Sequence, residues 1–177
     1  MGHVRLSEHI DAPVDHVWDI NASCERLPEW NVNIVEVKDC QGRLDRVGAR
    51  VTTVVRVFGR KIEGSQETTK AEKPHAFALK LIGAGGAKAT VNGTYTEAGG
   101  GTDASVDLEY DLPMGLFAGV AEKLLGGSIE RDLRHSMENF RHSASRRFQL
   151  ASEPRLRMGT AGHSARRNPL AKEEATQ

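Results

Sequence analysis

Tyrosine, glutamine and glutamate side chains in the middle of the sequence are the ones whose chemistry could act on a bound molecule. Tyr95 and Tyr110 both fall on the apolar side of an alternating segment, where a buried ring presents its hydroxyl to a ligand or to solvent. A desolvated Glu67 could be the general base of an aldol-type cyclisation, although most glutamates lie at the surface. These residues offer hydrogen bonds to a ligand or the beginning of an acid–base site.

The register of residues 61–71 decides which further polar groups face inward. In one register these are Gln66 and Thr68, and a shift by one residue replaces them with Ser65 and Glu67. The sequence leaves both registers open, and we expect Gln66 to contact a ligand.

Histidines and cysteines do not indicate a metal or redox site. His135 and His142 lie seven residues apart on one predicted helix face, without the three or four converging ligands that a metal needs. Cys24 and Cys40 have neither metal-ligand nor redox spacing, so we expect reduced thiols in a cytoplasmic protein. We expect no metal and no cofactor.

Charge is unevenly distributed along the 177 residues, although the formal net charge is zero. From Arg141 onward eight basic and three acidic residues give +5, and the residues before it carry −5. An acidic body argues against a nucleic-acid partner. No apolar run approaches the roughly 18 residues of a membrane span. We therefore expect no integral membrane segment, with transient membrane contact open.

Alternating and β-branched segments predict a sheet of about seven strands. The first covers residues 3–10, and Asp11-Ala12-Pro13 then starts a short helix that carries Val17 and Trp18. A second short helix is predicted over 23–27, ended by Pro28. The remaining strands are predicted at 31–38, 50–58, 61–71, 77–82, 87–97 and 102–111.

A long amphipathic helix is predicted after the last strand, over 116–147. Gly126-Gly127 lies inside it, either as a kink or as a point of close approach to a ligand. No periodicity continues beyond Phe148. We therefore expect one ligand-binding domain over 1–148 and a disordered basic tail over 149–177.

Several short motifs occur in an order that resembles the helix-grip, or START-like (SRPBCC), superfamily. They are Ile10-Asp11-Ala12-Pro13 followed by Val17-Trp18, then Leu27-Pro28-Glu29-Trp30, the Glu72-Lys73-Pro74 turn and the Gly99-Gly100-Gly101-Thr102 hairpin. The resemblance implies an α+β helix-grip fold, with a curved antiparallel sheet wrapped on the C-terminal helix and two short helices after the first strand. The superfamily includes lipid and quinone carriers, ligand sensors and polyketide cyclases.

Small residues at inward positions indicate where a pocket would form. Ala89, Gly93 and Ala104 leave space between sheet and helix, unless the core packs tightly around them. The residues that we expect to contact a ligand are Trp30, Val55, Val57, Gln66, Phe77, Leu79, Val91, Tyr95, Leu108, Tyr110, Leu124 and Leu133.

Binding of a hydrophobic small molecule is the function that the sequence favours. The protein would carry or sense a lipid, a quinone or a polyketide-like aromatic, as a monomer or homodimer. One alternative is a polyketide cyclase or dehydratase that uses the same cavity. Another is a protein-interaction or stress-response module. The residues favour binding over catalysis.

Overall fold

The fold was obtained as a computed structural model, which describes residues 1–40, 42–57, 59–113 and 122–152. Seven antiparallel strands form one sheet, in the order β1-β7-β6-β5-β4-β3-β2. Two 3-10 turns, η1 (Cys24–Arg26) and η2 (Ala84–Gly86), accompany the three helices. The strands are β1 (Gly2–Ile10), β2 (Ile34–Cys40), β3 (Arg50–Val57), β4 (Arg60–Glu72), β5 (Ala76–Gly83), β6 (Lys88–Ala98) and β7 (Gly101–Asp111). The helices are α1 (Val14–Ala22), α2 (Leu27–Trp30) and α3 (Glu122–Ser152).

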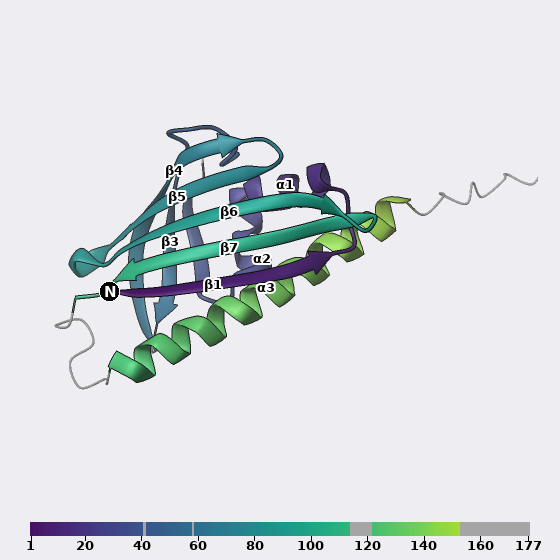
Figure 1. Cartoon of the computed structure of the whole chain (residues 1–177). Coiled ribbons are helices and arrows are strands. Elements are labelled where there is room, and N and C mark those ends of the chain that lie inside the picture. Colours follow the sequence, from purple (N-terminus) through teal and green to yellow (C-terminus); the bar gives the residue numbers. More distant parts are fainter. Residues whose placement is uncertain (41, 58, 114–121, 153–177) are drawn as a thin grey trace, which may run out of the picture.

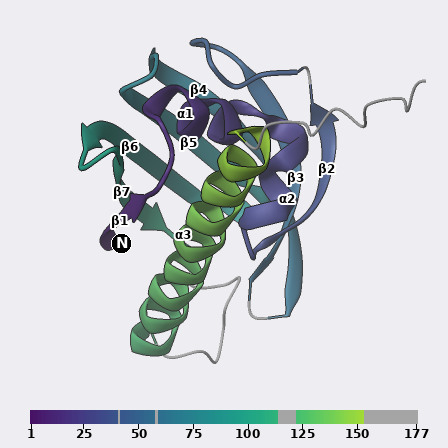
Figure 2. The same ribbon diagram turned by 90° about the vertical axis from the view of Figure 1, so that its right-hand side faces the viewer.

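The sheet curves around one side of α3, as Figures 1 and 2 show from two directions. α3 packs along β1, and its second half contacts α1 and α2. α1 and α2 lie at one end of the sheet and cover the concave face there. This arrangement confirms the predicted helix-grip fold.

Alternating polarity along β7 shows why the sheet has a dry and a wet face. Ala104 and Val106 are buried, whereas Asp103 is exposed. On the wet face Asp107 accepts hydrogen bonds from Arg5 at 2.8 Å and from His3 at 2.9 Å. Arg5 lowers the pKa of the Asp107 carboxyl, with a smaller contribution from His3. Polar cross-strand pairs therefore hold β1 to β7 on the outside, while small apolar residues face α3.

The short connection after α1 differs in detail from the prediction. Pro28 lies in the first turn of α2 and does not end a helix, because a first-turn residue needs no backbone donor. β2 begins at Ile34, since the Asn31 side chain accepts a hydrogen bond from the Asn33 amide and forms a turn first.

α3 runs without a break from Glu122 to Ser152, so the Gly126-Gly127 pair does not separate two helices. A Cβ at Gly126 would lie 3.5 Å from the Tyr110 hydroxyl, which makes this a point of close approach between helix and sheet. α3 ends later than the predicted residue 147, because the helix continues to Ser152. Residues 116–121 of the predicted helix and 153–177 of the predicted tail lie outside the described residues.

β2 is an edge strand with an irregular pairing to β3. The register shifts between Ile34 and Glu36 and again between Val37 and Asp39. Lys38 pairs with Glu63 on β4, and this neighbour raises the pKa of Lys38. The outermost strand is therefore bulged and charged.

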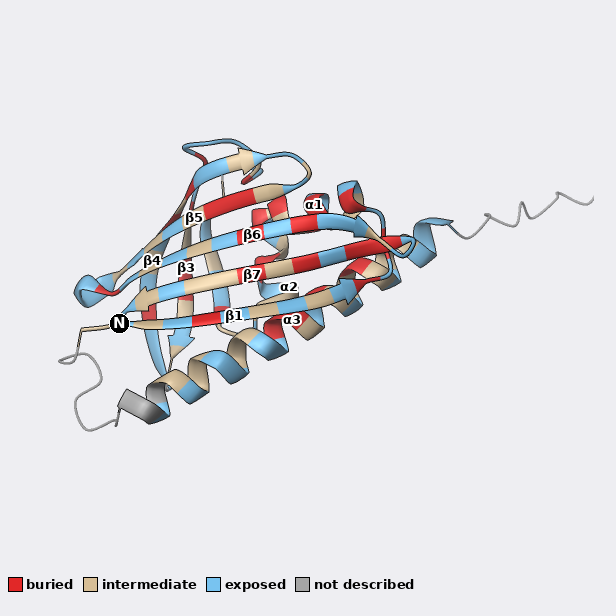
Figure 3. Cartoon of the chain, viewed as in Figure 1, coloured by how far each residue is buried: buried red, intermediate tan, exposed pale blue. Residues whose placement is uncertain are grey.

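Buried side chains concentrate toward the α1 end of the molecule (Figure 3). Among the α3 side chains that the structure describes, the buried ones run from the middle of the helix toward its C-terminal end: Ser136, Met137, Phe140 and Ala144. One apolar cluster joins them to α1 and to the inward residues of β5, β6 and β7. The main core thus occupies the half of the sheet that α1 covers.

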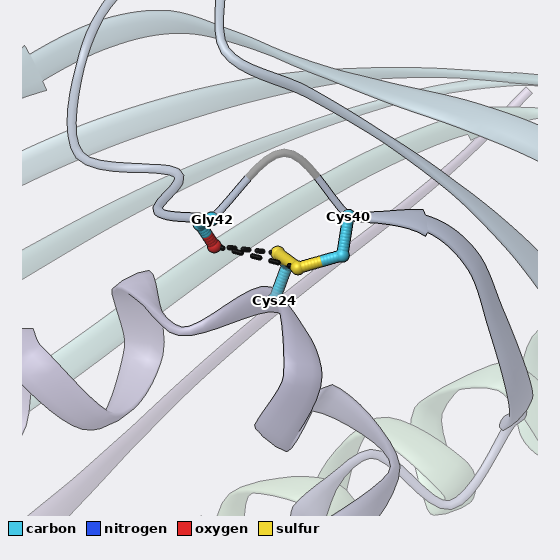
Figure 4. Close-up of a disulfide and its surroundings, with 3 residues drawn as sticks. All are labelled: Cys24, Cys40 and Gly42. Carbon is cyan, nitrogen blue, oxygen red and sulfur yellow. Dashed lines mark hydrogen bonds between the residues drawn. A yellow bond between two sulfur atoms is a disulfide. The ribbon is translucent and has the colours of Figure 1, made fainter.

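A disulfide joins Cys24 of η1 to Cys40 at the end of β2, across 16 residues of sequence (Figure 4). The prediction of two reduced thiols is wrong, because folding brings η1 against the end of β2 and no feature of the spacing indicates that approach. Both sulfurs lie near the Gly42 carbonyl oxygen, at 2.6 Å from Cys24 Sγ and 3.5 Å from Cys40 Sγ. The bond ties the segment that contains α2 to the edge of the sheet.

Candidate functional site

Inward side chains of β4 to β7 form four cross-strand rows on the concave face. From the end near η2 to the end near α1, the rows are Gln66-Leu81-Ala89-Tyr110, Thr68-Leu79-Val91-Leu108, Ala71-Phe77-Gly93-Val106, and Tyr95-Ala104. Ala89 and Tyr95 are six residues apart on β6, which is a span of about 20 Å. Polar side chains lie in the first and last rows, and the residues between them on β5, β6 and β7 are apolar.

A cavity of about 260 Å³ lies between these rows and α3. Its volume lies just below the roughly 300–1,000 Å³ found for ligand pockets. None of the described lining residues is charged. The lining consists of Trp18, Asn21, Ala22, Leu27, Trp30, Asn31, Asn33, Ile34, Leu44, Val55, Val57, Gln66, Phe77, Leu79, Leu81, Ala89, Val91, Tyr95, Ala104, Val106, Leu108, Tyr110, Leu112, Ile129, Leu133, Ser136, Met137 and Phe140.

Most of the residues predicted to contact a ligand are brought together by the fold. Eleven of the twelve line the cavity: Trp30, Val55, Val57, Gln66, Phe77, Leu79, Val91, Tyr95, Leu108, Tyr110 and Leu133. Leu124 is the exception, because its position on α3 turns the side chain to solvent, where it is 66% exposed. The helical spacing of the apolar residues was predicted correctly, but the first turns of α3 turn Leu124 away from the sheet.

The end of the cavity beneath α1, here called the closed end, is built from aromatic rings. The Tyr95 ring stands edge-on to Trp18, with ring centroids 6.4 Å apart, and its centroid lies 5.7 Å from that of Phe77. Trp30 and Phe140 form a second aromatic pair, with ring centroids 5.0 Å apart. Tyr95 is only 3% exposed, and burial raises the pKa of its hydroxyl. The hydroxyl is therefore neutral at physiological pH and can donate or accept a hydrogen bond.

Hydrogen-bond donors without partners gather at the closed end. The indole nitrogens of Trp18 and Trp30 are buried and have no partner among the described residues. Both tryptophans line the cavity, and indole N–H groups can only donate. Both nitrogens have essentially no accessible surface, so they lie within the packed wall of this end and do not face the cavity.

The opposite end, here called the open end, lies near η2 and the start of α3. Its lining residues Leu81, Ala89, Tyr110, Leu112 and Ile129 are all half-buried. None of them belongs to the fully buried core of the described residues. The cavity therefore approaches solvent at this end.

The register of β4 is settled in favour of Gln66. Gln66 is buried, pairs with Leu81 across the sheet, and its amide nitrogen donates to Thr53 Oγ1 at 3.4 Å. Glu67 points to the outer face, where its carboxylate lies 2.9 Å from Arg50. The Glu67 general-base hypothesis is wrong, because the side chain lies on the side of the sheet away from the cavity.

Small residues open the cavity at two of the three predicted positions. Ala89 and Ala104 line it. Gly93 does not add space, because the Phe77 ring lies over it and a Cβ there would collide with that ring. Gly93 therefore serves the packing of the closed end.

The N-terminal elements supply lining residues that sequence reasoning missed. Leu27, Ile34 and Leu44 form a side wall and belong to the apolar cluster around Cys24. The alternation that identified inward residues on the long strands gives no signal for a wall built from α2, the first residue of β2 and a loop. Ser136 on α3 was also missed, and it accepts a hydrogen bond from the Val32 amide at 3.1 Å.

Comparison with known proteins assigns the family. A family model described as polyketide cyclase/dehydrase and lipid transport matches residues 1–144. The chain belongs to this family. Its match covers β1 through most of α3 and confirms the superfamily resemblance.

Individual relatives and solved structures have low sequence identity to this chain. Rv1546, an uncharacterized protein of Mycobacterium tuberculosis, is 26% identical over 144 residues, which cover 78% of this chain and 98% of that protein. A conserved protein from Geobacillus kaustophilus superposes with a TM-score of 0.69 at 14% identity, covering 82% of this chain and 96% of the other. DynU16, from the dynemicin biosynthetic locus, superposes with a TM-score of 0.56 at 19% identity, covering 79% of this chain and 46% of that one. These structural similarities show a shared fold.

No described helix combines the length and apolar character needed to cross a membrane. His135 and His142 are exposed on α3. Within the described residues, no three His, Cys, Asp or Glu side chains converge as a metal site.

Proposed function

We propose that the protein binds a slender hydrophobic molecule in the cavity under α3 and carries or senses it without changing it. The observation that supports this most directly is the lining, which contains no charged side chain among the described residues around about 260 Å³. Mostly apolar walls with a few polar groups are typical of ligand pockets. A lipid, a quinone or a polyketide-like compound fits this chemistry.

The composition of the lining favours binding over catalysis. General acid–base chemistry needs a group that exchanges protons near neutral pH. Burial moves the pKa of Tyr95 away from that range, and Glu67 lies outside the cavity paired with Arg50. Gln66 and Tyr95 lie in the first and last rows, too far apart to act on one bond.

Cyclisation or dehydration remains the second candidate because the family description includes cyclases and dehydrases. It would have to use the Tyr95 hydroxyl or the Gln66 amide to polarise a substrate carbonyl. Turnover of a polyketide-like substrate that either Gln66→Leu or Tyr95→Phe abolishes would favour this candidate over a carrier.

A cytoplasmic location stays a proposal as well. The Cys24–Cys40 disulfide weakens it, because such bonds persist mainly in oxidising compartments. Cell fractionation with a thiol-alkylating mass tag would locate the protein and report the state of both cysteines.

The test of binding is to detect a ligand and then fill the cavity. Native mass spectrometry should reveal a co-purified apolar molecule, and the neutral dye Nile red should bind the emptied protein. Ala89→Phe places a ring inside the small cavity and should weaken Nile red binding by at least about tenfold, or 1.4 kcal/mol.

Ala151→Phe, on the exposed end of α3, is the matched control and should leave Nile red binding unchanged. Absence of both a co-purified ligand and Nile red binding would contradict the proposed function. Equal binding by the wild type and Ala89→Phe would place the binding site elsewhere.

A further inference from the structure

The cavity has chemically different ends, and this difference restricts which part of a ligand can enter first. The closed end is lined by the aromatic side chains of Trp18, Phe77 and Tyr95, and of these Tyr95 alone carries a hydroxyl. The residues of β5, β6 and β7 in the second and third rows, which include Leu79 and Val91, are apolar. The open end is half-buried and approaches solvent.

A charged group at the closed end would have no counter-ion. None of the described lining residues is Asp, Glu, Lys, Arg or His. Buried charges in proteins are paired or coordinate metals, since desolvation of an unpaired charge is costly. A carboxylate, phosphate or ammonium is therefore excluded from this end, whereas at the open end it can stay hydrated.

A plain hydrocarbon end is also a poor match. It would place no hydrogen-bond partner beside the Tyr95 hydroxyl, at a site where water is largely excluded. An uncharged oxygen with free lone pairs supplies the missing acceptor and brings no charge. Tyr95 is the group best placed to use it, because its side chain lines the cavity in the last row.

We propose that the ligand enters with an uncharged, oxygen-bearing end leading, and that the Tyr95 hydroxyl hydrogen-bonds this oxygen at the closed end. The inference rests on the proposed function and adds the ligand class to it. The preferred molecules are elongated alcohols, ketones or esters with an apolar middle. The rows spanning about 20 Å and the small volume together favour a slender chain over a wide ring system.

Molecules with identical groups at both ends test the leading end, because they cannot turn a charge toward solvent. The probes are the α,ω-diol of dodecane and the corresponding α,ω-dicarboxylic acid, each competing with Nile red. At about pH 8, where carboxylic acids are ionised, the diol should displace the dye at least about tenfold more effectively. Equal displacement by the diacid would overturn the inference while leaving the proposed function intact.

The role of Tyr95 is tested with two variants that each remove one hydroxyl from β6. Tyr95→Phe keeps the ring and should weaken diol binding by about two- to tenfold, the effect of one hydrogen bond. Thr94→Val removes the neighbouring hydroxyl on the exposed outer face of the same strand and should leave the diol affinity unchanged. Nile red affinity, which does not depend on this hydrogen bond, should be equal in both variants and confirms that each is folded.

The outcomes separate the two proposals. An unchanged diol affinity in Tyr95→Phe, or an equal loss in Thr94→Val, would overturn the leading-end inference alone. Failure of Nile red, the diol and the diacid to bind the wild-type protein would overturn the proposed function and this inference with it.

Discussion

The closed and open ends of the cavity are made from the same sheet and the same helix, yet they are packed very differently. Trp18, Tyr95 and Phe140 at the closed end are 2–3% exposed. Leu112 and Ile129 at the open end are half-buried. α1 accounts for the difference, because it covers the concave face at one end only.

This difference teaches that one apolar face can serve stability and binding at separate places. Burial of large side chains is the main source of folding free energy, and here it is concentrated beneath α1. The open end contributes less to stability and can therefore admit a ligand. Substitutions at the two ends should differ correspondingly.

The largest effect is expected from removing a ring at the closed end. Phe140→Ala should lower the free energy of unfolding by about 3–5 kcal/mol, because it leaves a cavity in a dense core. Ile129→Ala, three turns earlier on α3, should lower it by about 1–2 kcal/mol, since that side chain is half-buried. Urea denaturation measures both, and equal losses would erase the distinction between the ends.

Loss of the disulfide is expected to have the next largest effect. Replacing both Cys24 and Cys40 by serine should lower the free energy of unfolding by about 3 kcal/mol, as estimated from a closed loop of this length. Urea denaturation with and without dithiothreitol measures it, and the double variant should not respond to the reductant. A wild-type protein that is equally insensitive would show that the thiols are already reduced.

Two glycine substitutions test the difference in packing between the two ends through smaller changes in stability. Gly93→Ala should lower the free energy of unfolding by about 2 kcal/mol, because its Cβ would displace the Phe77 ring. Gly127→Ala on α3 has no atom within 4 Å of its Cβ and should raise stability by up to about 1 kcal/mol. Thermal melts of the two variants should therefore shift in opposite directions, and a shared direction would contradict the packing described here.

The smallest effect is a dependence on alkaline pH that arises at the closed end. Burial raises the pKa of Tyr95 in the folded protein, so the folded state retains a proton that the unfolded state loses above about pH 10. The free energy of unfolding therefore keeps its full value below about pH 10. Above that pH it decreases, by up to about 1.4 kcal/mol for each pH unit. Melting curves of wild type and Tyr95→Phe should diverge only above that pH, and parallel curves would contradict a buried hydroxyl.

Regular alternation made the sheet and much of the cavity predictable. The inward residues of β5, β6 and β7 follow directly from the period-two alternation of apolar residues. This alternation placed Phe77, Val91 and Tyr95 correctly on the cavity wall. The glycine turns set the strand order because each joins neighbouring antiparallel strands.

Features that depend on how distant elements meet could not be predicted. The register of β4 depends on its partners, since Gln66 and Glu67 suit either face by type alone. The Cys24–Cys40 bond depends on η1 reaching the end of β2. Leu124 follows the helical period, but only packing fixes the rotation of the first turns of α3.

The two register shifts in β2 also affect how the protein behaves at high concentration. A flat, regular edge strand is a template on which a second molecule can add a strand and begin an aggregate. The bulges after Ile34 and Val37 disturb that template, and the Lys38–Glu63 pair adds charge beside it. At the opposite edge, β1 is accompanied by α3. Both edges of the sheet thus carry features that natural proteins use against edge-to-edge pairing.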